Sequence, residues 1–119
     1  MTEKHLQNEI LRQFGTDARI RLWRANAGVA VAGEVSRILT MCRRAGIAAR
    51  PVRFGVPGQA DLTGILPDGR RLEIEVKAAR GRQTEDQQNY QTMIERLGGV
   101  YVLAYSVEDV REALNSEGR

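Results

Sequence analysis

A turn signal near the middle of the chain constrains the fold more than any other feature of the sequence. Pro67, Asp68 and Gly69 combine a residue that presets its own φ angle with one that accepts a positive φ angle. An apolar run, residues 62–66, precedes the turn, and an alternating run, residues 70–77, follows it. We therefore expect the two runs to pair as an antiparallel hairpin.

Helical and β patterns surround this hairpin on both sides. Apolar residues recur at helical spacing in four segments: residues 3–14, 34–45, 84–97 and the stretch after Ser106. Residues 19–25 and 100–105 have the composition of strands. The order helix, strand, helical excursion, hairpin, helix, strand, helix predicts an α/β fold with a mixed central sheet flanked by helices.

Size and composition limit the class of protein. A length of 119 residues suits one hydrophobic core, so we expect a single domain over residues 1–119. The net charge of +3 is a mild indication of a polyanionic partner. The lone cysteine, Cys42, excludes an internal disulfide and favours a reducing cytoplasm, and the lone histidine, His5, excludes a histidine metal cluster. No stretch has the apolar length of a membrane span, so no membrane partner is expected.

The hairpin register brings two acidic residues together. If residues 67–69 form a three-residue loop, Asp61 lies opposite Glu75 on the same face of the hairpin. Two carboxylates this close repel each other unless a cation or a proton lies between them. A divalent metal bound by oxygen ligands fits such a pair, and the backbone carbonyl of Val76 would supply a third oxygen. A register shift of one residue would move Asp61 to the other face.

Lys77 lies two residues beyond Glu75 and therefore shares its face of the strand. A lysine at this place can hold an attacking water and offset the charge that develops on a phosphate. The alternative is an ordinary half-exposed strand whose charged face is solvated. The combination of Asp61, Glu75 and Lys77 favours metal-assisted phosphodiester hydrolysis.

Two interpretations stand for Gln87. It falls on the same helical stripe as Tyr90, Ile94 and Leu97, which places a polar side chain on the buried face. It also follows Thr84 at the spacing of a capping box, in which it would only satisfy a backbone donor at the helix start. One residue can serve both purposes.

These residues resemble a known family. GVPGQAD at residues 55–61, IEVK at residues 74–77 and a glutamine ten residues past the lysine are similar to the VRR-NUC branch of the PD-(D/E)XK nucleases, especially its stand-alone phage and bacterial members. WRANAG at residues 23–28 and the ending GGVYVLAYSVEDV extend the resemblance over nearly the whole chain. One departure is Ala60, where the family commonly has a proline. That proline sets the chain direction and is not a ligand.

The resemblance implies a restriction-endonuclease-like core, dependence on Mg2+ or Mn2+, and cleavage of DNA, often at branched, flapped or Holliday-junction-like structures. When the roles known in the family are assigned to the matching positions, the resemblance implies that Asp61 and Glu75 are metal ligands. It also implies that Lys77 is the catalytic lysine and Gln87 the polar partner on the helix. The family also places a glutamate of the first helix near the site. We prefer Glu3, because it shares the stripe of residues 6, 10 and 14.

Three further residues are assigned to DNA binding. Arg24 and Asn26 are placed to contact phosphates, with Gly28 permitting close backbone approach, and Arg53 lies in the glycine-rich approach to the hairpin. The alternative for residues 24–28 is a charged strand end that leads into a turn. Residues 34–50 look like an insertion that helps to recognise DNA, forms a subunit contact or packs on the core.

The sequence therefore predicts a metal-dependent, structure-specific DNA endonuclease in the cytoplasm of a bacterial or phage-infected cell. The principal alternative is a non-catalytic DNA-binding protein that retains the nuclease fold, and a subunit-interaction module is more distant. We also expect a C2 homodimer, since two related sites suit coordinated cutting of a symmetric branched substrate. Its candidate interface is the apolar stripe of Val35, Ile38, Leu39 and Cys42.

Overall fold

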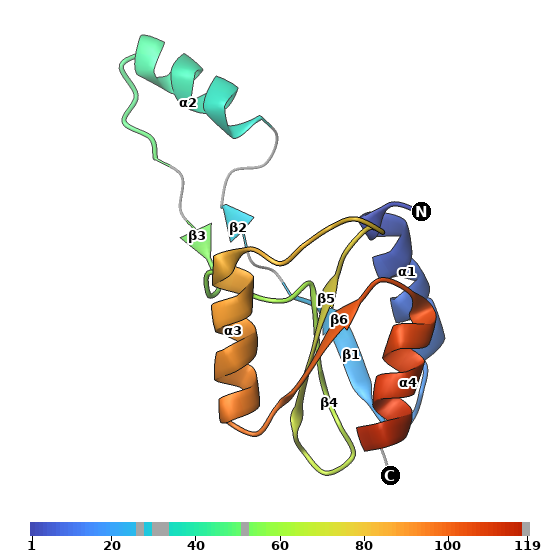
Figure 1. Ribbon diagram of the computed structural model, residues 1–119. Helices are drawn as coiled ribbons and strands as arrows, with labels where there is room; N and C mark the ends of the chain where they lie inside the picture. Colours follow the sequence, from blue (N-terminus) through green and yellow to red (C-terminus); the bar gives the residue numbers. More distant parts are fainter. Residues whose placement is uncertain (26–27, 30–33, 51–52, 118–119) are drawn as a thin grey trace. The chain divides into compact units, whose positions relative to one another are not determined.

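The structure is a computed structural model that describes residues 1–25, 28–29, 34–50 and 53–117 (Figure 1). It divides into two compact units. One comprises Met1–Ala25 and Pro57–Arg119, and the other comprises Asn26–Val56. Among the described residues, no helix has both the length and the apolar character needed to cross a bilayer.

A four-stranded mixed sheet forms the centre of the first unit. Its strands are β1 (Arg21–Arg24), β4 (Leu62–Ile65), β5 (Arg71–Val76) and β6 (Val100–Ala104), in the order β1-β4-β5-β6. The first three pair antiparallel, and β6 runs parallel to β5. The mixed sheet predicted from the sequence is confirmed.

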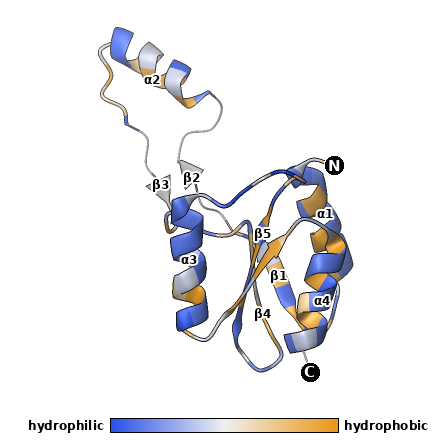
Figure 2. Cartoon of the chain, in the orientation of Figure 1, coloured by the Kyte–Doolittle hydropathy of each residue, from blue (hydrophilic) through white to orange (hydrophobic). Residues whose placement is uncertain are grey.

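Helices cover both faces of this sheet (Figure 1). Helices α1 (Glu3–Phe14) and α4 (Val107–Glu117) lie on one face, and α3 (Glu85–Arg96) lies on the other. The apolar sides of these helices are turned toward the sheet (Figure 2). The three layers therefore bury both faces of the central strands.

The larger core cluster lies between the sheet and the pair α1 and α4. The predicted stripe of Leu6, Ile10 and Phe14 is buried there against alternate residues of β5, which are Leu72, Ile74 and Val76. Each such aliphatic side chain contributes about 1.5–3 kcal/mol by leaving water. The opposite face packs on α3 through a smaller cluster of Ala60, Tyr90, Ile94 and Tyr101.

The hairpin has the register that its turn predicts. Leu62 pairs with Ile74 and Ile65 pairs with Arg71. The N–H of Leu66 donates to the carbonyl oxygen of Arg70 at 2.9 Å, which closes a loop of three residues. Gly69 has a φ angle of +89°, a conformation that L side chains rarely adopt. One step beyond the paired residues, Asp61 lies opposite Glu75.

The interpretation of β5 as a strand with a solvated charged face is wrong. Glu73 is 0% exposed, Glu75 is 2% exposed and Lys77 is 9% exposed. Helix α3 covers the face that carries them, because the connection from β5 to the parallel strand β6 crosses that side of the sheet (Figure 1). Glu73, Glu75 and Lys77 are therefore buried, whereas Arg71, at the start of β5, stays exposed.

In the described residues of the second unit, a two-stranded ribbon accompanies a helix. Strand β2 (Gly28–Val29) pairs antiparallel with β3 (Arg53–Phe54), and α2 (Val35–Arg44) lies between them in the sequence. The helix agrees with the prediction for residues 34–45. No residue of α2 is buried, and the stripe of Val35, Ile38, Leu39 and Cys42 is half-buried.

Candidate active site

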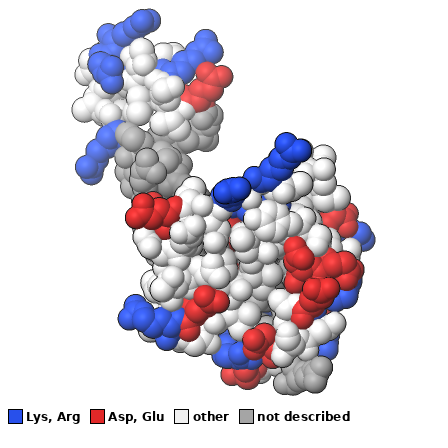
Figure 3. All heavy atoms as spheres, viewed as in Figure 1, with Lys and Arg blue, Asp and Glu red and all other residues white. Residues whose placement is uncertain are grey.

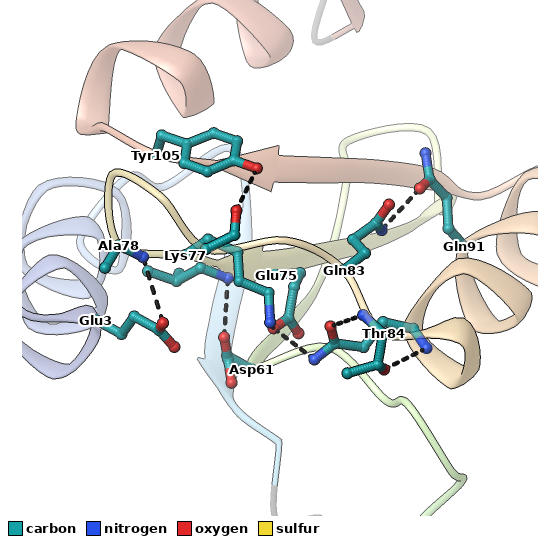
Figure 4. A network of polar contacts seen from close by, with 12 residues as sticks. Glu3, Asp61, Glu75, Lys77, Ala78, Gln83, Thr84, Gln91 and Tyr105 are labelled. Atoms are coloured by element: carbon teal, nitrogen blue, oxygen red, sulfur yellow. Dashed lines mark hydrogen bonds and ion pairs between the residues drawn. The ribbon is translucent and has the colours of Figure 1, made fainter.

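Side chains from four segments of the first unit meet at one end of the hairpin (Figure 4). Asp61 directly precedes β4, Glu75 lies in β5, and Lys77 directly follows β5. Gln87 comes from the first turn of α3, and Glu3 comes from the start of α1. The structure thus brings together the acidic, basic and amide side chains that the sequence singled out.

Asp61 is fixed between its two neighbouring strands. Its Oδ2 accepts a hydrogen bond from the N–H of Val76 at 2.8 Å, and its carbonyl oxygen accepts one from the N–H of Ala25 at 2.9 Å. Burial raises the pKa of Asp61 above its ordinary value, the N–H of Val76 opposes this rise, and the charge of Glu3 adds to it. Val76 contacts Asp61 through its N–H, so the binding of a metal by the carbonyl oxygen of Val76 stays a prediction.

Glu75 has one satisfied and one unsatisfied carboxylate oxygen. Its Oε2 accepts a hydrogen bond from Nε2 of Gln87 at 3.0 Å and lies 3.5 Å from Nζ of Lys77. Its Oε1 is buried and has no hydrogen-bond partner in the described part of the chain. Burial, followed by the charge of Asp61, raises the pKa of Glu75 to about 7, while Lys77 opposes the rise. The site is therefore short of positive charge.

Lys77 is a buried cation held in place by the sheet. Its side chain is 11% exposed, and its N–H donates to the carbonyl oxygen of Ala104 at 3.0 Å. Among the described residues, the ammonium group forms an ion pair only with the carboxylate of Glu75. It is thus directed into the site.

The capping box predicted for Gln87 is confirmed. The predicted buried stripe is confirmed at Tyr90 and Ile94 but is wrong at Leu97, which is 71% exposed beyond the end of α3. Its Oε1 accepts from the N–H of Thr84 at 2.9 Å, and its N–H donates to Oγ1 of Thr84 at 3.2 Å, which completes the capping box. The amide nitrogen of the same side chain donates to Glu75. The cap therefore fixes the amide group in the orientation that contacts the carboxylate.

The first helix brings Glu3 to the site and turns Glu9 away from it. Oε2 of Glu3 accepts from the N–H of Ala78 at 3.3 Å, just beyond the end of β5. Glu9 instead forms an exposed ion pair with Arg12 at 2.7 Å. Even so, Glu3, Asp61 and Glu75 do not form a three-ligand metal cluster, and none is found elsewhere among the described residues.

Sequence reasoning missed a second buried acid beside the site. Oε1 of Glu73 accepts from the hydroxyl of Tyr90 and from Nε of Arg71, the latter at 2.8 Å. Its Oε2 is buried without a partner among the described residues. Burial, and then Glu73, raise the pKa of Tyr90. The available signal was Tyr90 itself, a hydroxyl on the stripe that Gln87 shares.

A group of amides and tyrosines borders the site, and no pattern in the sequence indicated it. Nε2 of Gln83 donates to the hydroxyl of Tyr101 at 3.2 Å and to Oε1 of Gln91 at 2.9 Å. The hydroxyl of Tyr105 donates to the carbonyl oxygen of Gly81 at 2.9 Å. Burial raises the pKa of Tyr101 to about 12. These contacts hold the loop between β5 and α3 on the sheet.

The structure describes the three residues assigned to DNA binding to different extents, and it does not test this assignment. Arg24 is exposed and donates to the side-chain oxygens of Gln7, at 2.6 Å, and Asn8. Asn26 lies outside the described residues. The backbone of Arg53 belongs to β3, but its side chain is not described.

The approach to Asp61 is pressed against α3. Gly58 has a φ angle of +76°, and a Cβ atom there would lie 2.2 Å from the carbonyl oxygen of Asp86. Asp86 directly precedes Gln87 in the first turn of the helix. A glycine at position 58 therefore lets the chain that leads to Asp61 touch the helix end that carries Gln87.

These features define the class of the fold. A mixed sheet covered by helices, with carboxylates at one end of an antiparallel hairpin, is a restriction-endonuclease-like core. A solved structure described as a "VRR_NUC domain protein" shares this fold with a TM-score of 0.56 and 18% sequence identity. The similarity covers 98% of this chain and 87% of the other. No protein-family model matches the sequence, and no curated protein matches it.

We predict that Gly58→Ala destabilises the protein more than Gly69→Ala does. Both glycines have positive φ angles, so both variants lose about 1–2 kcal/mol from the backbone conformation. An added Cβ meets nothing within 4 Å at Gly69 but collides with Asp86 at Gly58. Urea unfolding of both variants measures the difference. Equal losses of stability would contradict the close contact with α3.

We also predict that Glu75→Gln stabilises the metal-free protein at about pH 8 more than at about pH 5. Because the pKa of Glu75 is raised to about 7, the folded protein holds a proton that the unfolded chain loses at its ordinary value of 4.5. The wild type therefore loses stability as the pH rises through this window, by about 1.4 kcal/mol for each unit between the two pKa values.

Thermal or urea unfolding in a chelator, at several pH values, measures this effect. Glu95→Gln, at an exposed position of α3, is the matched control and should follow the wild type. If the curves of Glu75→Gln and the wild type stay parallel from about pH 5 to about pH 8, burial does not hold the proton on Glu75.

Proposed function

We propose that this chain is a metal-dependent DNA endonuclease that hydrolyses phosphodiester bonds with Mg2+ or Mn2+. The observation that carries the proposal is the opposition of Asp61 and Glu75 at one end of a nuclease-like fold, with Oε1 of Glu75 buried and without a described partner. An unsatisfied buried carboxylate oxygen costs stability, so its presence calls for a cation or a functional reason.

The donor set suits a hard divalent cation. Mg2+ and Mn2+ prefer oxygen ligands, and both carboxylates supply them on one face of the hairpin. Asp61 and Glu75 would hold the metal, with the carbonyl of Val76 as a third ligand and Glu3 as a nearby acid. When bound, such an ion polarises a phosphoryl oxygen and lowers the pKa of a water molecule.

Lys77 and Gln87 complete the site, and both lie next to Oε2 of Glu75. The buried ammonium of Lys77 lies where it can orient the attacking water and offset charge that develops on the phosphate. Gln87 occupies Oε2 of Glu75 and leaves Oε1 for another partner. The amide is a positioning group, because it acts through the carboxylate.

The nature of the substrate is proposed from the resemblance to VRR-NUC proteins. It favours DNA, and branched, flapped or junction structures over plain duplex. A non-catalytic DNA-binding protein with this fold is the alternative, and turnover separates the two. The homodimer and the cytoplasmic location also stay predictions.

We predict that Asp61→Asn and Glu75→Gln each abolish DNA cleavage while the fold is retained. Each change removes a charge needed for metal binding but little volume. The assay is cleavage of flap, four-way-junction, single-stranded and duplex DNA with Mg2+ and with Mn2+. Glu9→Gln, which changes a half-buried acid on the same helix as Glu3 but turned away from the site, should cleave as the wild type does. Cleavage by both site variants would refute the proposed site.

We predict that Lys77→Ala lowers turnover by a factor of about 10² or more and leaves metal binding much less affected. The ammonium is assigned to the water and the developing charge, and it is not a ligand. The rise in melting temperature on adding Mn2+ measures metal binding. Lys4→Ala, at the only other lysine, is the matched control. Wild-type turnover by Lys77→Ala would remove the lysine from the mechanism.

A further inference from the structure

The two units carry very different charge. Residues 26–56 contain five arginines and one acidic residue, Glu34, which gives a net charge of +4. The first unit contains thirteen Lys and Arg residues and fourteen Asp and Glu residues, which gives −1. The whole positive charge of the chain, +3, therefore comes from the segment inserted between β1 and β4.

Helix α2 separates its basic residues from its apolar ones. At 100° per residue, Arg37, Arg43 and Arg44 fall on one arc, which we call the basic arc. All three arginines are exposed. The opposite arc carries the half-buried apolar stripe of residues 35, 38, 39 and 42. In Figure 3 blue side chains project from several places on the mostly white visible surface of this unit, where red is also seen.

The charges of the basic arc are scarcely neutralised within the protein. Arg37 lies 3.8 Å from Glu34, and both side chains are about three-quarters exposed, at 76% and 75%. A surface pair of this kind contributes little. Arg43 and Arg44 form no ion pair with any described residue. These arginines are thus available to an external anion.

The first unit does not supply this attraction through its net charge. That charge is negative, and Glu3, Asp61 and Glu75 lie at one end of the sheet, with the buried Glu73 beside them in β5. A DNA backbone carries one negative charge for about every 1.7 Å of duplex and is repelled by such a site. Basic side chains outside the site are needed to hold it.

Both ends of the inserted segment are anchored next to the site. The chain leaves the first unit after Ala25, whose N–H donates to the carbonyl oxygen of Asp61 at 2.9 Å. It returns at Pro57, and the next residue, Gly58, packs against the first turn of α3. The basic segment is therefore joined to the first unit at Ala25 and Pro57, and Ala25 is hydrogen-bonded to the backbone of Asp61.

We propose that the basic arc of α2 binds the phosphate backbone of the DNA substrate, in a manner independent of base sequence. This inference rests on the proposed function, because it names the surface that holds the substrate for the same site. From Arg37 to Arg44 the helix rises about 10 Å, which matches roughly three phosphates of one strand along the DNA axis. The apolar arc is left free for other contacts, including a second copy of the chain.

The test is the salt dependence of DNA binding by the full chain in a chelator, so that no cleavage occurs. The probe is a short fluorescent duplex followed by anisotropy between about 50 and 200 mM salt. One variant combines Arg37→Gln, Arg43→Gln and Arg44→Gln. The matched control combines Arg12→Gln, Arg21→Gln and Arg96→Gln, which are exposed positions of the first unit. Both triple variants have the same net charge, and circular dichroism checks that both are folded.

We expect the α2 variant to bind about tenfold or more weakly at the lowest salt, and the slope of log K against log salt to fall by about 2.7. The control should stay within about twofold of the wild type. Equal losses in both variants, or no loss in the α2 variant, would overturn the inference. So would a loss of binding to anionic lipid vesicles with unchanged DNA binding, because it would assign the basic arc to a membrane surface.

Cleavage in Mn2+ separates this inference from the proposed function. A wild type that binds DNA through α2 but cuts no substrate would contradict the proposed function alone. An α2 variant that binds and cuts as the wild type does would contradict only the role of α2. Light scattering of Ile38→Glu with Leu39→Glu reports separately whether a second copy occupies the apolar arc.

Discussion

The site depends on one constraint, the opposition of two carboxylates across a tight hairpin. A three-residue loop fixes the register, and the register places Asp61 opposite Glu75. The N–H of Val76 and the amide of Gln87 each hold one carboxylate oxygen, and helix α3 keeps water from the face that carries Glu75. These contacts hold the two carboxylates close enough to repel each other. A proton or a cation is required to relieve this repulsion.

Polar contacts also join helix α3 to the residues of the site. The side chain of Gln87 binds Thr84, the residue that caps α3, and also contacts Glu75. The start of the helix and the carboxylate are therefore ordered together. Gly58 presses the segment before Asp61 onto that helix start. The buried pair of Glu73 and Tyr90 joins the middle of α3 to the same strand. A shift of α3 would thus disturb each of these contacts.

Much of this arrangement could be predicted from local sequence. The Pro-Asp-Gly turn determines the hairpin register, and the spacing of Thr84 and Gln87 identifies both the cap and the inward-facing amide. The burial of Glu73 could not be predicted in this way. Alternation along a strand tells which residues share a face, but what covers that face depends on the path of α3 and on the parallel pairing of β6. The separation of the inserted segment into its own unit likewise depends on contacts distant in sequence.

The central claim is that the opposed carboxylates form a metal site, and the most direct measurement is anomalous diffraction from crystals of the protein soaked in Mn2+. We expect an anomalous peak between Asp61 and Glu75, at coordination distance from a carboxylate oxygen of each. Crystals of Glu75→Gln should lack that peak under the same conditions. A wild-type crystal with no peak at these residues, or with Mn2+ bound only elsewhere, would contradict the account.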